Sequence, residues 1–209
     1  MTLAQLSTFA VALFAIANPI GTIGVFLGLT ADQSNAERNK TAVSTFAACT
    51  IIFLLFTWTG DIVLAAFGIS LAAFQAAGGF IVVLVALSML NAKISPMQHN
   101  EAEAQEAQQK SAVGVVPLAI PILAGPGAIT TIIVHSNKFQ AFGDRLEMSA
   151  VGVCISLSIL ISYLCANFIS RVLGAIGINI ATRLMGLVLA AIGFDIMGEG
   201  VRTLLGLGH

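Results

Sequence analysis

The chain has 209 residues, of which 57% are hydrophobic and only 9% are charged. A soluble domain carries about 25% charged residues, so this chain could not cover a water-facing surface, and we expect the lipid bilayer to be its solvent. The net charge of −1 and the lack of any lysine- or arginine-rich block argue against a nucleic-acid partner.

Six stretches are long and apolar enough to cross the hydrocarbon core, which needs about 20 helical residues. None of them alternates apolar and polar residues as the strands of a membrane β-barrel do. The sequence therefore predicts an all-α, polytopic membrane protein with six transmembrane helices. In chain order, the predicted segments are Leu6–Leu29, Ala42–Phe67, Leu71–Leu90, Val113–His135, Met148–Ile169 and Ile178–Leu205.

The first segment contains a proline near its middle. Proline lacks an N–H, and its ring clashes with the carbonyl four residues back, so Pro19 is expected to free the carbonyl of Ala15. Gly21 adds backbone freedom beside it. We therefore predict that the first helix is broken at membrane depth. No Lys or Arg precedes Arg38, so the segment lacks the basic start of a signal peptide and is expected to be retained.

The second and third segments contain no proline. Trp58, followed by Asp61, is expected to anchor the end of the second helix at the membrane interface. In the third helix, the run Ala76-Ala77-Gly78-Gly79 removes side-chain bulk and is expected to permit close helix packing rather than ligand binding.

A polar, low-complexity stretch at 93–111 divides the chain into near-equal halves. We interpret it as a linker between two repeats. Residues 1–92 would form the first three-helix repeat, and residues 112–209 the second.

The fourth segment is predicted to be interrupted like the first. Four of the five prolines of the chain lie in these two segments, and in the fourth, glycines flank the last proline. The residues concerned are Pro117, Pro121, Gly125, Pro126 and Gly127.

The last segment carries Asp195 and Glu199 four residues apart, on one face of the predicted helix, with Arg202 close to that face. An ionisable group inside a membrane is a functional candidate, so Asp195 is a candidate carrier of a coupled proton. The alternative is an ion-paired helix end near the interface.

The two halves share short local matches at nearly one offset. Pro19 and Pro126 are 107 positions apart, and Gly78 and Gly186 are 108 apart. Three crossings per half would invert the second half relative to the first. Inverted repeats with broken helices in matching positions are typical of secondary transporters.

Two broken helices at membrane depth could hold a small zwitterion. Helix N-termini offer N–H groups and a positive dipole end to a carboxylate, and freed carbonyls suit an ammonium group. The alternative is a pair of kinked helices without a ligand. The predicted substrate-binding residues are Asn18, Pro19, Gly21, Thr22, Gly125, Pro126, Gly127 and Thr130, with Thr131 as a further hydrogen-bonding side chain.

Loop charges predict the orientation. Six Lys and Arg residues lie in one set of predicted loops and three in the other, which favours a cytoplasmic location for the first set. The bias therefore predicts a multi-pass protein with both termini in the periplasm. The first set is Arg38, Lys40, Lys93, Lys110, Arg171 and Arg183, and the second is Lys138, Arg145 and Arg202.

Two motifs resemble signatures of the MarC family of bacterial inner-membrane proteins. They are Asn18-Pro19-Ile20-Gly21 and the stretch 117–130, which reads PLAIPILAGPGAIT. The resemblance covers the whole chain and implies a six-helix protein of the inner membrane whose two motifs line a site. Some members of the family are regarded as transporters of small neutral amino acids such as glycine and alanine, which implies a similar substrate here.

Our first hypothesis is a secondary transporter of a small neutral amino acid or similar metabolite, with proton coupling and with sodium as the alternative ion. A non-transporting membrane scaffold or assembly factor and a small channel are the alternatives, and homo-oligomerisation stays open. No enzyme is predicted, because no Gly-x-Ser-x-Gly, His-Glu-x-x-His or Walker sequence occurs. Cys49, Cys154 and Cys165 lie apart in apolar segments, so no metal site and no resident cofactor is expected.

Overall fold

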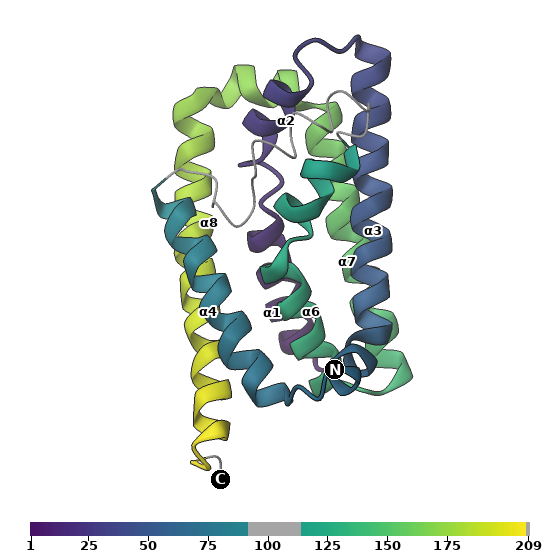
Figure 1. Cartoon of the computed structure of the whole chain (residues 1–209). Helices are drawn as coiled ribbons and strands as arrows, with labels where there is room; N and C mark the ends of the chain where they lie inside the picture. Colours follow the sequence, from purple (N-terminus) through teal and green to yellow (C-terminus); the bar gives the residue numbers. More distant parts are fainter. Residues whose placement is uncertain (92–113, 208–209) are drawn as a thin grey trace.

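The computed structural model describes residues 1–91 and 114–207, and in this part of the chain all regular structure is helical (Figure 1). The predicted linker at 93–111, with Lys93 and Lys110, lies outside the described residues, as does the boundary between the predicted repeats. The elements are α1 (Leu3–Ala17), α2 (Ile23–Leu29), α3 (Asn35–Ala66), α4 (Leu71–Leu90), η1 (Gly114–Leu123), α6 (Pro126–Lys138), α7 (Phe142–Leu164) and α8 (Ala166–Leu204).

Four helices, α3, α4, α7 and α8, are long and apolar enough to cross a membrane. The first and fourth predicted segments are each divided into two shorter pieces, α1 with α2 and η1 with α6. The all-helical, polytopic class is confirmed. The assembly of six crossings into two inverted repeats stays a prediction. Both termini lie at the same end of the bundle (Figure 1).

The distribution of polar and apolar residues also suits a bilayer. Large apolar side chains such as Ile62, Phe80 and Phe168 are more than half exposed on the outside. Polar side chains such as Thr45 and Ser156 are buried and donate to carbonyls four residues back in their own helices. The outer surface is therefore apolar, and buried hydroxyl groups such as those of Thr45 and Ser156 are satisfied within their own helices.

Two helix boundaries differ from the prediction for local reasons. The second predicted helix starts at Asn35 instead of Ala42, because Ser34 and Glu37 form a capping box: the Glu37 carboxylate accepts from the Ser34 N–H at 2.8 Å. The loop predicted between the fifth and sixth segments is helical, because α8 begins directly after Cys165 and only kinks at Gly174. Gly174 has a φ of 61°, which glycine adopts without steric cost.

Helices α4 and α8 pack backbone to backbone along their length (Figure 1). On α8, Gly186, Gly193 and Gly200 recur every seven residues, and each lies against α4. On α4, a Cβ added at Gly79 would lie 2.4 Å from the main-chain nitrogen of Met197. The predicted packing role of the glycine pair on α4 is thus confirmed for Gly79.

Helices α3 and α7 are joined by a polar cluster at the end of the bundle that holds the termini. The Arg145 guanidinium donates to the Asp61 carboxylate at 2.9 Å and to the Trp58 carbonyl at 3.2 Å. The Trp58 indole N–H donates to the Ser149 hydroxyl at 3.1 Å. Trp58 and Asp61 therefore fix α3 against α7.

Replacing Asp61 by asparagine is expected to lower the free energy of unfolding by about 2 kcal/mol, since the Arg145 side chain is only 13% exposed and would lose its counter-charge. For a chain of this length, this corresponds to a fall of roughly 4–8 °C in Tm, measurable by circular dichroism in detergent. Lys138→Gln is the control, because the Lys138–Glu199 pair is about half exposed. It should cost less than about 1 kcal/mol. Equal losses in the two variants would contradict the difference in burial.

Candidate functional site

The first break, at residues 18–22, is built around Asn18. It ends α1 in the left-handed conformation (φ 42°, ψ 60°), and no other non-glycine residue in the described part of the chain has a positive φ. Asparagine tolerates this conformation better than most residues. The Asn18 Oδ1 accepts from the Gly21 N–H at 3.1 Å, and the Thr22 hydroxyl lies 3.1 and 3.2 Å from the carbonyl oxygens of Asn18 and Pro19. The two predicted polar side chains thus hold the break in shape.

The break leaves main-chain acceptors at the end of α1. Pro19 has no N–H, and the Gly21 N–H is turned to the Asn18 side chain. As a result, no donor among the described residues is hydrogen-bonded to the carbonyls of Ala15, Ile16 or Ala17. The predicted effect of Pro19 on Ala15 is therefore present, and it extends to the next two carbonyls.

The second break lies at Ala124 and Gly125. The π-helix η1 is closed by a bond from the Ala124 N–H to the Ala119 carbonyl at 2.8 Å, and Gly125 is extended before α6 begins at Pro126. Proline suits the first helical position, where an N–H would be unpaired in any case. No side chain caps α6. Within the described residues, the N–H groups of Gly127 and Ala128 are left without an acceptor.

The two breaks meet because α1 and α6 lie antiparallel and side by side (Figure 1). Further from the breaks, the rings of Phe9, in the middle of α1, and His135, near the end of α6, are 5.1 Å apart. Near the breaks, a Cβ added at Gly127 would lie 3.6 Å from the Ile16 side chain. The negative end of the α1 dipole, with its free carbonyls, therefore lies beside the positive end of α6, with its free N–H groups.

The predicted substrate-binding residues at the two breaks differ in how far they are buried. Asn18, Pro19, Thr22, Gly125 and Gly127 are buried, Gly21 is partly exposed and Pro126 is exposed. Both breaks thus lie at least partly inside the protein.

Thr130 is buried too, but its side chain is directed at α4. A Cβ added at Gly78 would lie only 1.9 Å from its Cγ2 atom. Thr131 is fully buried, and its hydroxyl has no hydrogen-bond partner among the described residues.

Helix α8 adds a residue that the sequence did not single out. A Cβ added at Gly21 would lie 2.4 Å from the Thr182 hydroxyl and 2.0 Å from the Asn18 amide nitrogen. Thr182 therefore packs directly onto the first break. One threonine in an apolar helix is too common a feature to have indicated this contact.

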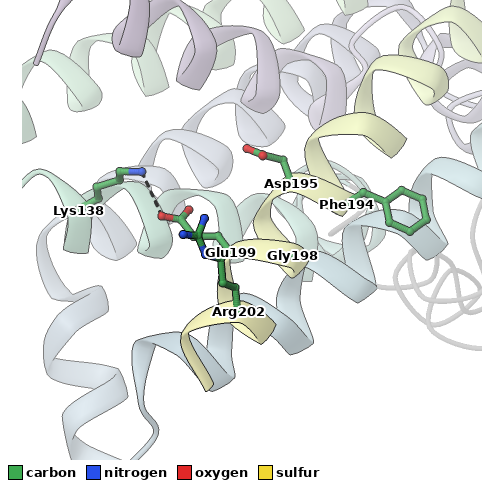
Figure 2. Close-up of a pocket in the computed structure, with 6 residues that line it drawn as sticks. All are labelled: Lys138, Phe194, Asp195, Gly198, Glu199 and Arg202. Atoms are coloured by element: carbon green, nitrogen blue, oxygen red, sulfur yellow. Dashed lines mark hydrogen bonds and ion pairs between the residues drawn. The ribbon is translucent and has the colours of Figure 1, made fainter. Parts of the chain in front are cut away.

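Asp195 lies away from the breaks, in the wall of an open cavity of about 490 Å³ (Figure 2). Glu199, one turn further on, pairs with Lys138 of α6 at 3.3 Å, so the helix end is ion-paired with α6. Lys138 is twelve residues beyond Pro126, or about 18 Å along α6. The cavity is lined by Lys138, Phe194, Asp195, Gly198, Glu199 and Arg202.

An apolar exterior, membrane-length helices and two interrupted segments inside the bundle define a polytopic integral membrane protein. Comparison with known proteins gives the family: the model of the MarC family of integral membrane proteins matches residues 3–205. The chain belongs to the MarC family.

Relatives of the chain cover nearly its whole length. UPF0056 membrane protein YhcE of Escherichia coli is 37% identical over 93% of this chain and 90% of its own length. UPF0056 membrane protein YvbG of Bacillus subtilis is 37% identical over 92% of both chains. A UPF0056 membrane protein of Methanocaldococcus jannaschii is 35% identical over 92% of this chain and 94% of its own length. No solved structure matches the chain.

Proposed function

We propose that this protein is a secondary transporter of a small neutral amino acid, similar to glycine or alanine, or of a similar small metabolite. The proposal rests on one observation: the free carbonyls at the end of α1 lie beside the free N–H groups at the start of α6. Unpaired main-chain groups inside a membrane protein are costly unless they line a cavity or meet a ligand.

The two sets of groups suit the two charges of an amino acid. The carbonyls of Ala15, Ile16 and Ala17 would accept from its ammonium group. The N–H groups of Gly127 and Ala128 would donate to its carboxylate, aided by the helix dipole, which contributes up to about 2 kcal/mol in a partly buried geometry. Gly127 carries no side chain, and a Cβ there would already lie 3.5 Å from the Val82 side chain and 3.6 Å from that of Ile16. The ligand would therefore be small.

Alternating access would follow from the inverted repeat, in which one set of elements moves against the other around a fixed central site. Asp195 would carry a coupled proton in the cavity between α6 and α8, with sodium as the alternative ion. In a bacterium, the protein would lie in the inner membrane with both termini in the periplasm, as the loop charges predict.

The proposal is tested by uptake of labelled glycine and L-alanine into proteoliposomes. Saturable uptake is expected, with competition by the unlabelled amino acids and none by glutamate. A proton gradient should drive accumulation, and Asp195→Asn should abolish this accumulation while leaving glycine–glycine exchange intact. A response to a sodium gradient alone would assign the other ion.

Protein-free vesicles give the background rate. Flux that rises linearly with concentration would indicate a channel. A rate equal to that of empty vesicles in both uptake and efflux would leave the scaffold as the surviving function.

A further inference from the structure

We infer that the open cavity between the ends of α6 and α8 binds a phospholipid whose headgroup carries both a phosphate and an ammonium group. This is the cavity of about 490 Å³ whose wall includes Asp195 (Figure 2). The inference does not depend on the proposed transport. Asp195 can serve both this site and the proposed proton coupling, because its protonation would only release the ammonium group.

The cavity lies at the end of the helices, where the membrane interface is expected. Lys138 is the last residue of α6, and Arg202 lies in the last turn of α8. Both helices end on the side of the bundle that holds the termini (Figure 1), as does the cluster around Trp58. Tryptophan and charged side chains gather at the boundary between hydrocarbon and water. A phospholipid places its headgroup at this same depth.

The charges in the cavity wall are balanced. Lys138 and Arg202 are positive, and Asp195 and Glu199 are negative. The Lys138 ammonium lies 3.3 Å from the Glu199 carboxylate, and both side chains are about half exposed, so a ligand can reach them. Asp195 makes no hydrogen bond or ion pair with any described residue. A wall with two charges of each sign is complementary to a ligand that itself carries both signs.

An exposed apolar row on α8 continues from the charged side of the cavity. Its members are Phe194, Val201 and Leu205, which are 58%, 41% and 67% exposed. They are seven and four residues apart and so share one side of the helix, next to the side that carries Asp195. Phe194 also belongs to the cavity wall, and in Figure 2 its ring extends away from the Asp195 carboxylate. The cavity therefore suits a ligand with a charged end and an apolar body, which favours a phospholipid over a free zwitterion.

Each charged part of such a headgroup has its counterpart in the wall. The phosphate oxygens would accept from the side chains of Lys138 and Arg202, and the ammonium group would donate to Asp195. Hydrogen bonds between charged partners are the stronger kind. The headgroup of phosphatidylethanolamine has three N–H donors for the carboxylate. Phosphatidylcholine has the same phosphate, but its trimethylammonium group has no N–H.

The inference is tested by native mass spectrometry of the delipidated full chain with phosphatidylethanolamine, phosphatidylcholine or phosphatidylglycerol, all with the same acyl chains. Phosphatidylethanolamine is expected to bind about fivefold more tightly than either of the other two, the size expected for one solvent-exposed ion pair. Glycerophosphoethanolamine, which has the headgroup without acyl chains, should not compete at equal concentration.

Asp195→Asn should bring the affinity for phosphatidylethanolamine down to that for phosphatidylcholine. Asp32→Asn is the matched control, because it removes the same charge from an exposed position in the loop before α3, outside the cavity. It should keep the fivefold preference. Lys138→Gln should weaken the binding of both lipids by a similar factor, since they share the phosphate.

Equal binding of the three lipids by the unsubstituted protein would overturn the inference, because contact with acyl chains alone would explain it. Tighter binding of phosphatidylglycerol, or an unchanged preference in Asp195→Asn, would overturn it as well. Competition by glycerophosphoethanolamine or glycine at equal concentration would show that the cavity takes a free zwitterion and not a lipid.

Discussion

Gly200→Ala is expected to force α4 and α8 apart and to lower the free energy of unfolding by about 3 kcal/mol. The added Cβ would lie 2.4 Å from the main-chain nitrogen of Ala76 and 2.7 Å from the Ala72 carbonyl oxygen. Main-chain atoms cannot rotate away as a side chain can, so the helices must shift. The corresponding fall in Tm is roughly 6–12 °C for a chain of this length.

Gly198→Ala is the control for this loss. It lies two residues away on the same helix, and a Cβ there would meet nothing within 4 Å. Alanine is favoured over glycine in a helix by about 1 kcal/mol, so this variant should be as stable as the unsubstituted protein or more so. Equal Tm values for the two variants would show that α4 and α8 do not touch as described.

Gly21→Ala is expected to reduce glycine uptake about 100-fold or more. The methyl group would occupy the position of the Asn18 amide nitrogen and lie 2.4 Å from the Thr182 hydroxyl. Asn18 would have to release the Gly21 N–H, and the left-handed turn that holds the break would be lost. Displacement of binding groups by about 1 Å is enough for a loss of this size.

Gly24→Ala is the control, because it makes the same substitution outside the break. Gly24 is three residues further on, in α2, and an added Cβ there has no neighbour within 4 Å. Initial rates of uptake should match those of the unsubstituted protein, with elution in size-exclusion chromatography as the check on folding. Normal uptake by Gly21→Ala would remove the first break from the transport site.

The breaks could be predicted because they depend on local chemistry. A proline acts on a carbonyl four residues away in the same helix, so Pro19 and Pro126 indicate interruptions wherever the helices pack. The four longest helices of the described residues could also be predicted from the sequence, since their length and apolar composition alone define them. The observed helices differ from the predicted ones at their ends. A capping box at Ser34 starts α3 earlier than predicted, and α8 begins before its kink at Gly174 instead of after it.

Contacts between helices could not be predicted in this way. The sequence predicts that Thr130 binds the ligand because it lies near Pro126, but its side chain meets Gly78 on another helix. Thr182 reaches the first break from a helix distant in sequence. Whether a side chain faces the break or a neighbouring helix depends on helix rotation, which a short apolar motif does not specify.

The seven-residue spacing of the glycines on α8 has a mechanical consequence. A strict seven-residue repeat stays on one side of a helix only if the two partners coil around each other with a left-handed twist. Because main-chain atoms of α4 lie against the glycines of α8, few side chains between the two helices could repack and absorb a displacement. We therefore expect this pair to move as one stiff unit, so that any opening and closing of the protein bends the chain at the interrupted helices instead.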